Sequence, residues 1–164
     1  MASWIDRQLR ERGIRDERVL GAMARVPRAL FVPLEARAHA YDDAALPLTH
    51  GQTISQPYIV ALTCQLLALD GSETVLDVGT GSGYAAAVLA ELAASVVTVE
   101  RIPDLAETAA ETLRRAGYPQ VEVRVGDGAL GAPDRAPFGG IAVAAAAPDV
   151  PPALWEQLAL GARI

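Results

Sequence analysis

The stretch VLDVGTGSGY at residues 75–84 limits the possible folds of this chain more than any other. Its apolar first half predicts a β-strand, and Gly79, Gly81 and Gly83 follow that strand at every second position. Glycine has no side chain, so a ligand can approach the backbone closely, and the helix expected from Tyr84 presents free amide groups at its start. The stretch therefore predicts a strand, a glycine loop and a helix arranged around a small-molecule ligand.

The chain on both sides of this loop predicts a regular alternation of strands and helices. Apolar runs indicate the strands, and apolar residues at helical spacing indicate the helices. Parallel strands need crossover helices, so this order favours an α/β fold with a parallel sheet covered on both faces. The predicted strands are 74–78, 96–99, 121–125 and 141–145, and the predicted helices are 57–69, 84–92, 103–116 and 152–160.

The region before this core has a different character. Residues 4–26 carry apolar side chains at roughly helical spacing, interrupted at Gly13 and ended by Pro27, which predicts two short helices. The prolines that follow predict an irregular connection. We expect one domain, in which residues 1–56 form a helical and irregular cap and residues 57–164 form the core.

Composition excludes several classes of protein. With 51% hydrophobic and 21% charged residues, the chain is too apolar to be disordered. A net charge of −6 disfavours nucleic acid and anionic membranes as partners, and no apolar run is long enough to span a bilayer. The single cysteine, Cys64, excludes an internal disulfide framework, and no signal-peptide pattern is present at the N-terminus. We therefore expect a cytoplasmic protein.

The glycine loop itself indicates which cofactor to expect. A nicotinamide fingerprint needs glycine at the sixth position counted from Gly79, but that position is Tyr84. Asp77 instead extends the loop to D-x-G-x-G-x-G, a spacing typical of S-adenosylmethionine sites. A structural turn without a ligand is the alternative. The predicted cofactor-binding residues in this loop are Asp77, Gly79, Thr80, Gly81, Ser82 and Gly83.

Two more acidic residues follow the next two predicted strands. Glu100 can accept hydrogen bonds from both hydroxyls of a ribose, and Asp127, followed by Gly128, can accept one from an adenine amino group. A solvated glutamate and an Asp-Gly turn are the respective alternatives. The glycine loop, Glu100 and Asp127 lie at three successive strand ends, and together they favour a ligand that contains ribose and adenine.

At these motifs the sequence resembles the protein-L-isoaspartate O-methyltransferase family. The similarity includes RGIRDERVLGAMARVPRALFVP, GQTISQPYIVA, VLDVGTGSGYAAAVLAEL, VERIPDL and GDG, and it covers nearly the whole chain. The resemblance implies a Rossmann-like, S-adenosylmethionine-dependent methyltransferase fold. It also implies methyl transfer to the α-carboxylate of isoaspartyl residues in damaged proteins or peptides, after which loss of the ester through a succinimide repairs the backbone.

The resemblance also assigns a role to the segment GQTISQP. Ser55 matches the family's active-site serine, and we expect Thr53, Ile54 and Gln56 beside it to contact the substrate. A carboxylate nucleophile is already ionised at neutral pH, so the reaction needs alignment and no general base. Ser55 is therefore interpreted as a hydroxyl that positions the carboxylate. From the local sequence alone, Ser55 or Thr53 could instead cap the helix that begins near Pro57.

Other reactive side chains lack the pattern of a site. His39 and His50 are not spaced as metal ligands with cysteines or carboxylates, so we expect no metal. Cys64 lies on an apolar helix and is expected to be a buried, unreactive thiol.

Two departures from the family pattern lead to further expectations. In PFGG, Gly139 stands where the family usually has an aspartate, which removes a hydrogen-bond anchor. The resemblance also implies seven strands in the order 3-2-1-4-5-7-6, whereas the chain ends at GARI, where a fifth strand is expected to begin. We therefore expect an incomplete C-terminus, or a second protomer that covers the bare edge of the fourth strand.

Alternatives to the repair activity stay open at this point. A relative that methylates normal aspartate in a dedicated peptide would share all these motifs, and a non-catalytic S-adenosylmethionine-binding module would share the cofactor loop. A small-molecule dehydrogenase is a more distant alternative, because the nicotinamide fingerprint fails.

Overall fold

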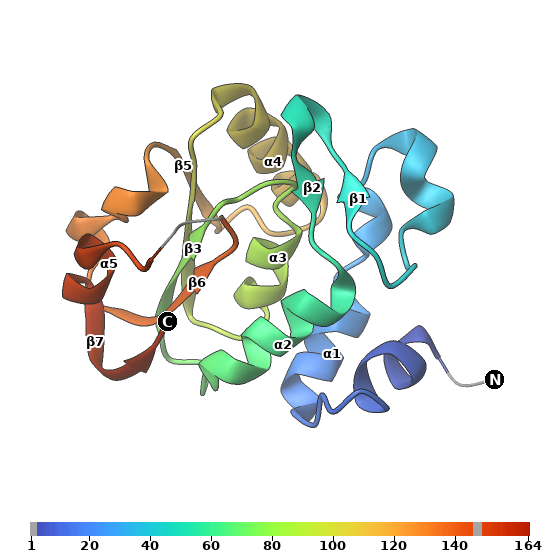
Figure 1. The fold of residues 1–164 in the computed structure, drawn as a ribbon, viewed down its shortest axis with the longest axis horizontal. Helices are drawn as coiled ribbons and strands as arrows, with labels where there is room; N and C mark the ends of the chain where they lie inside the picture. The colour runs from blue at the N-terminus through green and yellow to red at the C-terminus, as the bar shows by residue number, and fades with distance from the viewer. Residues whose placement is uncertain (1–2, 146–148) are drawn as a thin grey trace.

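The computed structural model describes residues 3–145 and 149–164. A five-stranded sheet runs through its centre in the order β5-β4-β3-β6-β7, and each neighbouring pair is parallel (Figure 1). The α/β fold predicted from the sequence is confirmed. The strands of this sheet are β3 (Thr74–Val78), β4 (Ser95–Glu100), β5 (Glu122–Val125), β6 (Phe138–Val143) and β7 (Leu158–Arg163).

The helices begin and end at residues with a clear local reason. Asp16 caps α1, because its carboxylate accepts hydrogen bonds from the backbone N–H groups of Arg18 (2.8 Å) and Val19 (3.4 Å). Three other helices start with proline, whose missing N–H costs nothing at that position. No helix in the described ranges is long and apolar enough to cross a bilayer. The helices are α1 (Glu17–Arg25), α2 (Pro57–Leu67), α3 (Tyr84–Ala90), α4 (Pro103–Arg115) and α5 (Pro152–Glu156).

Buried side chains pack on both faces of the sheet. Val75 and Leu76 are neighbours on β3, both fully buried, and they belong to different apolar clusters because successive strand residues point to opposite faces. One cluster joins the sheet to α1, α2 and α3, and the other joins it to α5. This packing fixes the positions of the strand ends. It therefore also fixes the positions of the residues that follow each strand.

The cap before α2 is built from short pieces. A turn of π-helix (Asp6–Arg10) precedes α1, and 3₁₀ turns (Arg28–Leu30 and Leu34–His39) occupy the proline-containing connection. An antiparallel pair, β1 (Leu46–Pro47) and β2 (Thr53–Ile54), then leads into α2. The tip of this hairpin lies near α4 in Figure 1, where His50 Nε2 is 3.7 Å from Asp104 Oδ2. The hairpin therefore reaches over the ends of the central strands.

The end of the chain differs from the expectation. The helix predicted over residues 152–160 stops at Glu156, and β7 follows it and pairs with β6 through Phe138–Leu158 and Gly140–Arg163. The expected bare edge on the fourth strand of the sheet is therefore wrong, since β7 covers it. Unpaired amides and carbonyls on the edge of β6 favour extended backbone over residues 158–163, and that long-range pairing outweighs the helical spacing of the apolar residues.

The structure accounts for Gly139 on β6. A Cβ atom at that position would lie 2.5 Å from Cγ of Glu73, so only glycine leaves room for the glutamate. The carboxylate of Glu73 accepts hydrogen bonds from the backbone N–H groups of Asp70 (2.7 Å) and Gly71 (2.8 Å). Glu73 therefore anchors this turn, at the opposite end of β6 from Val143.

Candidate active site

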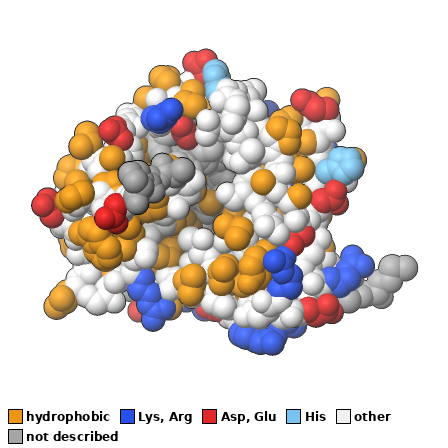
Figure 2. Space-filling model, in the orientation of Figure 1, with side chains coloured by type: hydrophobic (Ala, Val, Ile, Leu, Met, Phe, Trp, Pro, Cys, Tyr) orange, Lys and Arg blue, Asp and Glu red, His pale blue; other side chains and the backbone are white. Residues whose placement is uncertain are grey.

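A cavity of about 550 Å³ lies at the carboxyl ends of the central strands, where ligands bind in open α/β sheets. Figure 2 shows the surface hollowed near the middle of the face it presents. The hairpin, the glycine loop and the segments after β4, β5 and β6 all contribute to its walls. Of the residues predicted from the sequence, those that line this cavity are Thr53, Ile54, Ser55, Gly79, Thr80, Gly81, Ser82, Glu100, Asp127 and Gly128.

The glycine loop connects β3 to α3 through backbone conformations that favour glycine. The φ angles are 98° at Gly79, 53° at Gly81 and 87° at Gly83, all in the left-handed region. Gly79 and Gly81 line the cavity, whereas Gly83 packs behind it, where an added Cβ would lie 3.1 Å from Leu113. Gly83 therefore allows α3 to approach α4, and it does not reach the ligand space.

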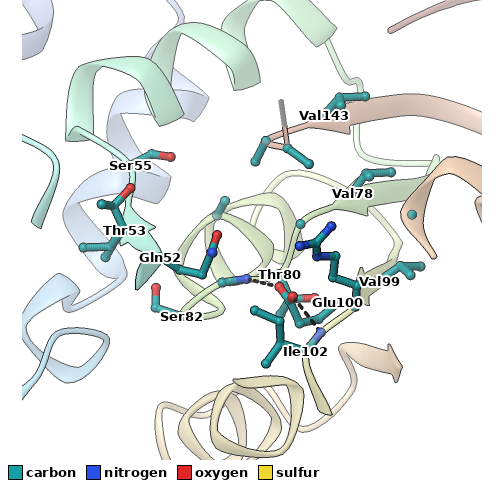
Figure 3. Close-up of a pocket in the computed structure, with 18 of the residues that line it drawn as sticks. Gln52, Thr53, Ser55, Val78, Thr80, Ser82, Val99, Glu100, Ile102 and Val143 are labelled. Atoms are coloured by element: carbon teal, nitrogen blue, oxygen red, sulfur yellow. Dashed lines mark hydrogen bonds between the residues drawn. The ribbon is translucent and has the colours of Figure 1, made fainter. Parts of the chain in front are cut away.

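Glu100 joins the glycine loop to the end of β4. Its carboxylate is almost fully buried, with Oε2 accepting a hydrogen bond from Gly81 N and Oε1 accepting one from Ile102 N, each at 3.0 Å (Figure 3). Each carboxylate oxygen has a second lone pair, so both can accept a further hydrogen bond from a ligand in the cavity. Glu100 therefore holds two loops together and presents acceptors to the same space.

Asp127 forms the Asp-Gly turn considered for it and also lies at the cavity wall. The residue is exposed at the cavity wall, and its Oδ1 accepts a hydrogen bond from Ala129 N at 2.9 Å, which caps the short turn Gly128–Leu130. An added Cβ at Gly128 would lie 2.5 Å from Cγ1 of Val78, so the backbone passes very close to β3. The Asp-Gly turn and the cavity wall are thus the same structure.

Asp77 lies beneath the glycine loop and does not line the large cavity. It is fully buried, and Thr98 Oγ1 donates a hydrogen bond to its Oδ2 at 2.8 Å. Its Oδ1 has no partner among the described residues. Burial raises the pKa of this carboxyl to about 7.

The raised pKa of Asp77 predicts a pH-dependent stability. Between the unfolded value of 3.8 and the folded value of about 7, the folded chain binds one more proton than the unfolded chain, so the free energy of unfolding falls as pH rises. We expect Asp77→Asn to lack this component, and its stability relative to the wild type to increase from pH 5 to pH 8. Urea unfolding at both pH values measures this change. A constant difference between the two proteins would contradict it.

Ser55 stands between the hairpin and α2, with its side chain half-buried at the cavity. The first residue flanking α2 is Gln56, and no side-chain capping hydrogen bond occurs there within the described residues. Gln56 does not line the cavity, because its side-chain Nε2 donates to the carbonyl of Asp43 at 3.1 Å. The helix-capping alternative is therefore not realised, and the hydroxyl of Ser55 stays available to a ligand (Figure 3).

A second cavity of about 190 Å³ adjoins the first. Ser55 lines both, and so do residues of α2, α3 and the end of β6. Its floor includes Asp77, Cys64 and Leu89, and its rim includes Ile59. The residues shared by the two cavities are Ser55, Val60, Ala85, Val143 and Ala144.

Comparison with known proteins assigns the chain to a family. The sequence model of the family described as "Protein-L-isoaspartate(D-aspartate) O-methyltransferase (PCMT)" matches residues 3–164. The chain belongs to this family. It is therefore a methyltransferase with a Rossmann-like fold, as the resemblance in the motifs implied.

Individual relatives of this methyltransferase support the same family assignment. Protein-L-isoaspartate O-methyltransferase 2 of Marinobacter nauticus is 60% identical over 157 residues, which are 96% of this chain and 72% of that protein. A solved protein-L-isoaspartate O-methyltransferase is 30% identical with a TM-score of 0.85, over 96% of this chain and 52% of that one. A Plasmodium falciparum structure described as a putative family member in complex with S-adenosyl-L-homocysteine is 26% identical with a TM-score of 0.80, over 94% and 78%. The chain thus spans about half to four fifths of these relatives' lengths.

Several wall residues of this methyltransferase were not predicted. Ala144 and Ala145 follow the end of β6, so the strand-end rule that identified Glu100 and Asp127 could have found them. Pro151 directly precedes α5 and Leu154 lies in it, and neither carries a signal in the sequence. The unpredicted lining residues are Gln52, Val60, Val78, Tyr84, Ala85, Val99, Arg101, Ile102, Ala129, Val143, Ala144, Ala145, Pro151 and Leu154.

The remaining reactive side chains of the methyltransferase lie outside the large cavity. Cys64 is buried on α2, and burial raises the pKa of its thiol to about 12, which keeps it protonated. His39 contacts Asp42, and His50 contacts Asp104, as surface pairs. Across the described ranges, no group of three or more His, Cys, Asp and Glu side chains is placed to hold a metal ion.

Proposed function

We propose that this chain transfers the methyl group of S-adenosylmethionine to the free carboxylate of L-isoaspartyl residues in damaged proteins or peptides. The observation that carries the proposal is the position of Ser55, which borders both cavities. One of them also contains Glu100, Asp127 and the glycine loop. A hydroxyl at the junction of a nucleoside-sized space and a smaller space can orient a nucleophile toward a cofactor.

The large cavity fits the cofactor in size and in chemistry. Its volume of about 550 Å³ lies within the range of roughly 300–1,000 Å³ that is usual for ligand sites. Glu100 offers acceptors to ribose hydroxyls, and Asp127 offers one to an adenine amino group. Acidic side chains also suit a ligand with a positively charged sulfonium, since Arg101 is the one basic side chain among the described lining residues.

The role of Ser55 follows from the charge of the substrate. When bound, S-adenosylmethionine supplies a methyl group on a positively charged sulfur. The substrate carboxylate has a pKa of roughly 3.5 and is ionised at neutral pH, so no residue of the chain needs to remove a proton. Ser55 donates one hydrogen bond to a carboxylate oxygen and leaves the other oxygen free to attack. Alignment of this kind is worth about 7–11 kcal/mol in ideal cases.

A neutral donor suits this position better than a cation. A lysine would bind the ionised carboxylate most strongly before the reaction, when its negative charge is greatest, and would therefore stabilise the ground state more than the transition state. The hydroxyl binds it less strongly. Ser55 thus positions the nucleophile without trapping it.

The second cavity provides a place for the substrate residue itself. Its mouth is bordered by Ile59 and Val143, which are 46% and 39% exposed, so an incoming peptide gains apolar contact there. Thr53 and Ile54 lie on the hairpin beside Ser55 and line the large cavity, and they stay predicted substrate contacts. Gln56 acts differently, because its side chain bonds to Asp43 and supports the loop.

The proposal is tested by comparing two peptides that differ at one residue. We expect methylation of an isoaspartyl peptide and none of the same peptide with normal aspartate, measured with radiolabelled S-adenosylmethionine. Methylation of normal aspartate would favour a dedicated aspartate methyltransferase. Cofactor binding without methylation of either peptide would identify a binding module, and tighter binding of NAD than of S-adenosylmethionine would favour a dehydrogenase.

Partners and location stay predictions from the sequence. A net charge of −6 disfavours nucleic acid as a partner, and the cytoplasm is the compartment expected for the protein. Because β7 pairs with β6, the edge of the fourth strand is not open to a second protomer, and the oligomeric state stays untested.

A further inference from the structure

Arg28 is a charged side chain in the interior of the protein. It begins the 3₁₀ turn after α1 and has no solvent exposure. Among residues 3–145 and 149–164, no carboxylate forms an ion pair with it, although eight arginine–carboxylate pairs occur elsewhere in that part of the chain. A buried charge without a counter-ion is costly, so its neighbours must compensate.

The partners of Arg28 are backbone carbonyls from two separate segments. Nη1 donates to the carbonyl oxygen of Ala40, and Nη2 donates to those of Ser55 at 2.8 Å and Ala44 at 3.4 Å. Its Cζ also lies 5.6 Å from the centre of the Tyr84 ring, within range of a cation–π contact. Tyr84 directly follows the glycine loop. One guanidinium therefore touches the cap, the Ser55 segment and the cofactor side of the site.

The bond to Ser55 fixes a part of the backbone that regular structure leaves free. β2 ends at Ile54 and α2 begins at Pro57, so the Ser55 carbonyl lies outside both elements. The next carbonyl, that of Gln56, already accepts from Ile59 N at 3.0 Å and Val60 N at 3.3 Å in the first turn of α2. Arg28 is thus the group that holds the peptide plane after Ser55, and this plane affects the direction of the Ser55 side chain.

A role in stability alone explains Arg28 poorly. Buried charged groups contribute little to stability compared with apolar side chains of similar volume. The rigid planar fork of arginine, in contrast, can donate to several carbonyls at fixed positions, which a lysine ammonium or an apolar side chain cannot reproduce.

We propose that Arg28 is a positioning residue, which holds the backbone of Ser55 so that its hydroxyl faces the junction of the two cavities. It acts on methyl transfer through Ser55 and Tyr84 and contacts neither substrate nor cofactor. The inference rests on the proposed function, since it assigns Arg28 a part in that reaction.

The test is Arg28→Lys, which keeps the charge and removes the fork. We expect kcat for the isoaspartyl peptide to fall about 10- to 100-fold, the loss typical of a reacting group displaced by about 1 Å, with the Kd for S-adenosylhomocysteine within about threefold of the wild type. Arg28→Gln, which removes the buried charge, serves as a second variant if the lysine destabilises the fold. Arg18→Lys is the matched control, because Arg18 also donates to two carbonyls, those of Leu69 and Leu92, away from the cavities.

A double-mutant cycle separates positioning from stability. If Arg28 acts through the hydroxyl of Ser55, the Arg28→Lys change costs little further kcat in a Ser55→Ala background. Full additivity of the two losses, or wild-type kcat in folded Arg28→Lys and Arg28→Gln, would overturn the inference. An inactive wild type would instead refute the proposed function, so the two failures are distinguishable.

Discussion

We expect the replacement of Ser55 by alanine to lower kcat for an isoaspartyl peptide by about 100-fold and to leave cofactor affinity nearly unchanged. The hydroxyl borders both cavities, and without it the carboxylate loses the donor that orients one of its oxygens. Misplacement by about 1 Å is enough for a loss of this size. We expect the effect in kcat because the substitution leaves unchanged the cofactor contacts that we propose, Glu100 and the glycine loop.

Steady-state kinetics with the peptide and calorimetric binding of S-adenosylhomocysteine measure these two quantities. Ser72→Ala is the control, since it removes a hydroxyl that bonds to Asp70 outside both cavities. An unchanged kcat in Ser55→Ala would show that the serine does not position the substrate. A large loss of cofactor affinity would mean that it supports the cofactor loop instead.

We expect the replacement of Glu100 by alanine to give the opposite pattern, with the Kd for the cofactor raised by about 100-fold or more. The carboxylate accepts hydrogen bonds from Gly81 N and Ile102 N, and the proposal adds ribose hydroxyls as further donors. Hydrogen bonds to charged groups contribute about 1.5–3 kcal/mol each, and about 1.4 kcal/mol corresponds to tenfold in affinity. Loss of two such bonds therefore accounts for the expected effect.

The control for Glu100 is Glu91→Ala. Glu91 also bonds two donors, Arg25 Nε at 2.6 Å and Tyr118 Oη at 2.8 Å, but it lies outside the cavity. We expect the control to lose some stability and to keep its cofactor affinity in the same binding measurement. Equal cofactor affinity in the wild type and Glu100→Ala would show that the ribose does not bind at this end of β4.

The sequence predicts those parts of the site that local pattern determines. Gly79 and Gly81 follow an apolar strand, and Glu100 and Asp127 follow the next two strands, so the common edge of a parallel sheet brings them together. The same reasoning places Asp77 near the cofactor, whereas the structure puts its carboxyl below the loop. Strand alternation turns residue 77 away from the large cavity, and the motif spacing does not reveal that direction.

Other features depend on contacts between distant segments, and the sequence does not reveal them. The apolar residues at 158–160 continue the helical spacing of α5, yet residues 158–160 form part of β7 because that segment pairs with β6. Arg28 lies in a segment that shares the family resemblance, but the sequence assigns it no role, because its acceptors are backbone carbonyls, which every residue type provides. The second cavity likewise arises where α2 and the end of β6 meet the hairpin.

The most direct measurement is a crystal structure with S-adenosylhomocysteine and an isoaspartyl peptide. The account predicts the ribose against Glu100 and the substrate carboxylate within about 2.6–3.2 Å of the Ser55 hydroxyl. The carboxylate is also expected to point at the cofactor sulfur from the second cavity. A peptide bound elsewhere, or a hydroxyl turned away from the sulfur, would contradict it.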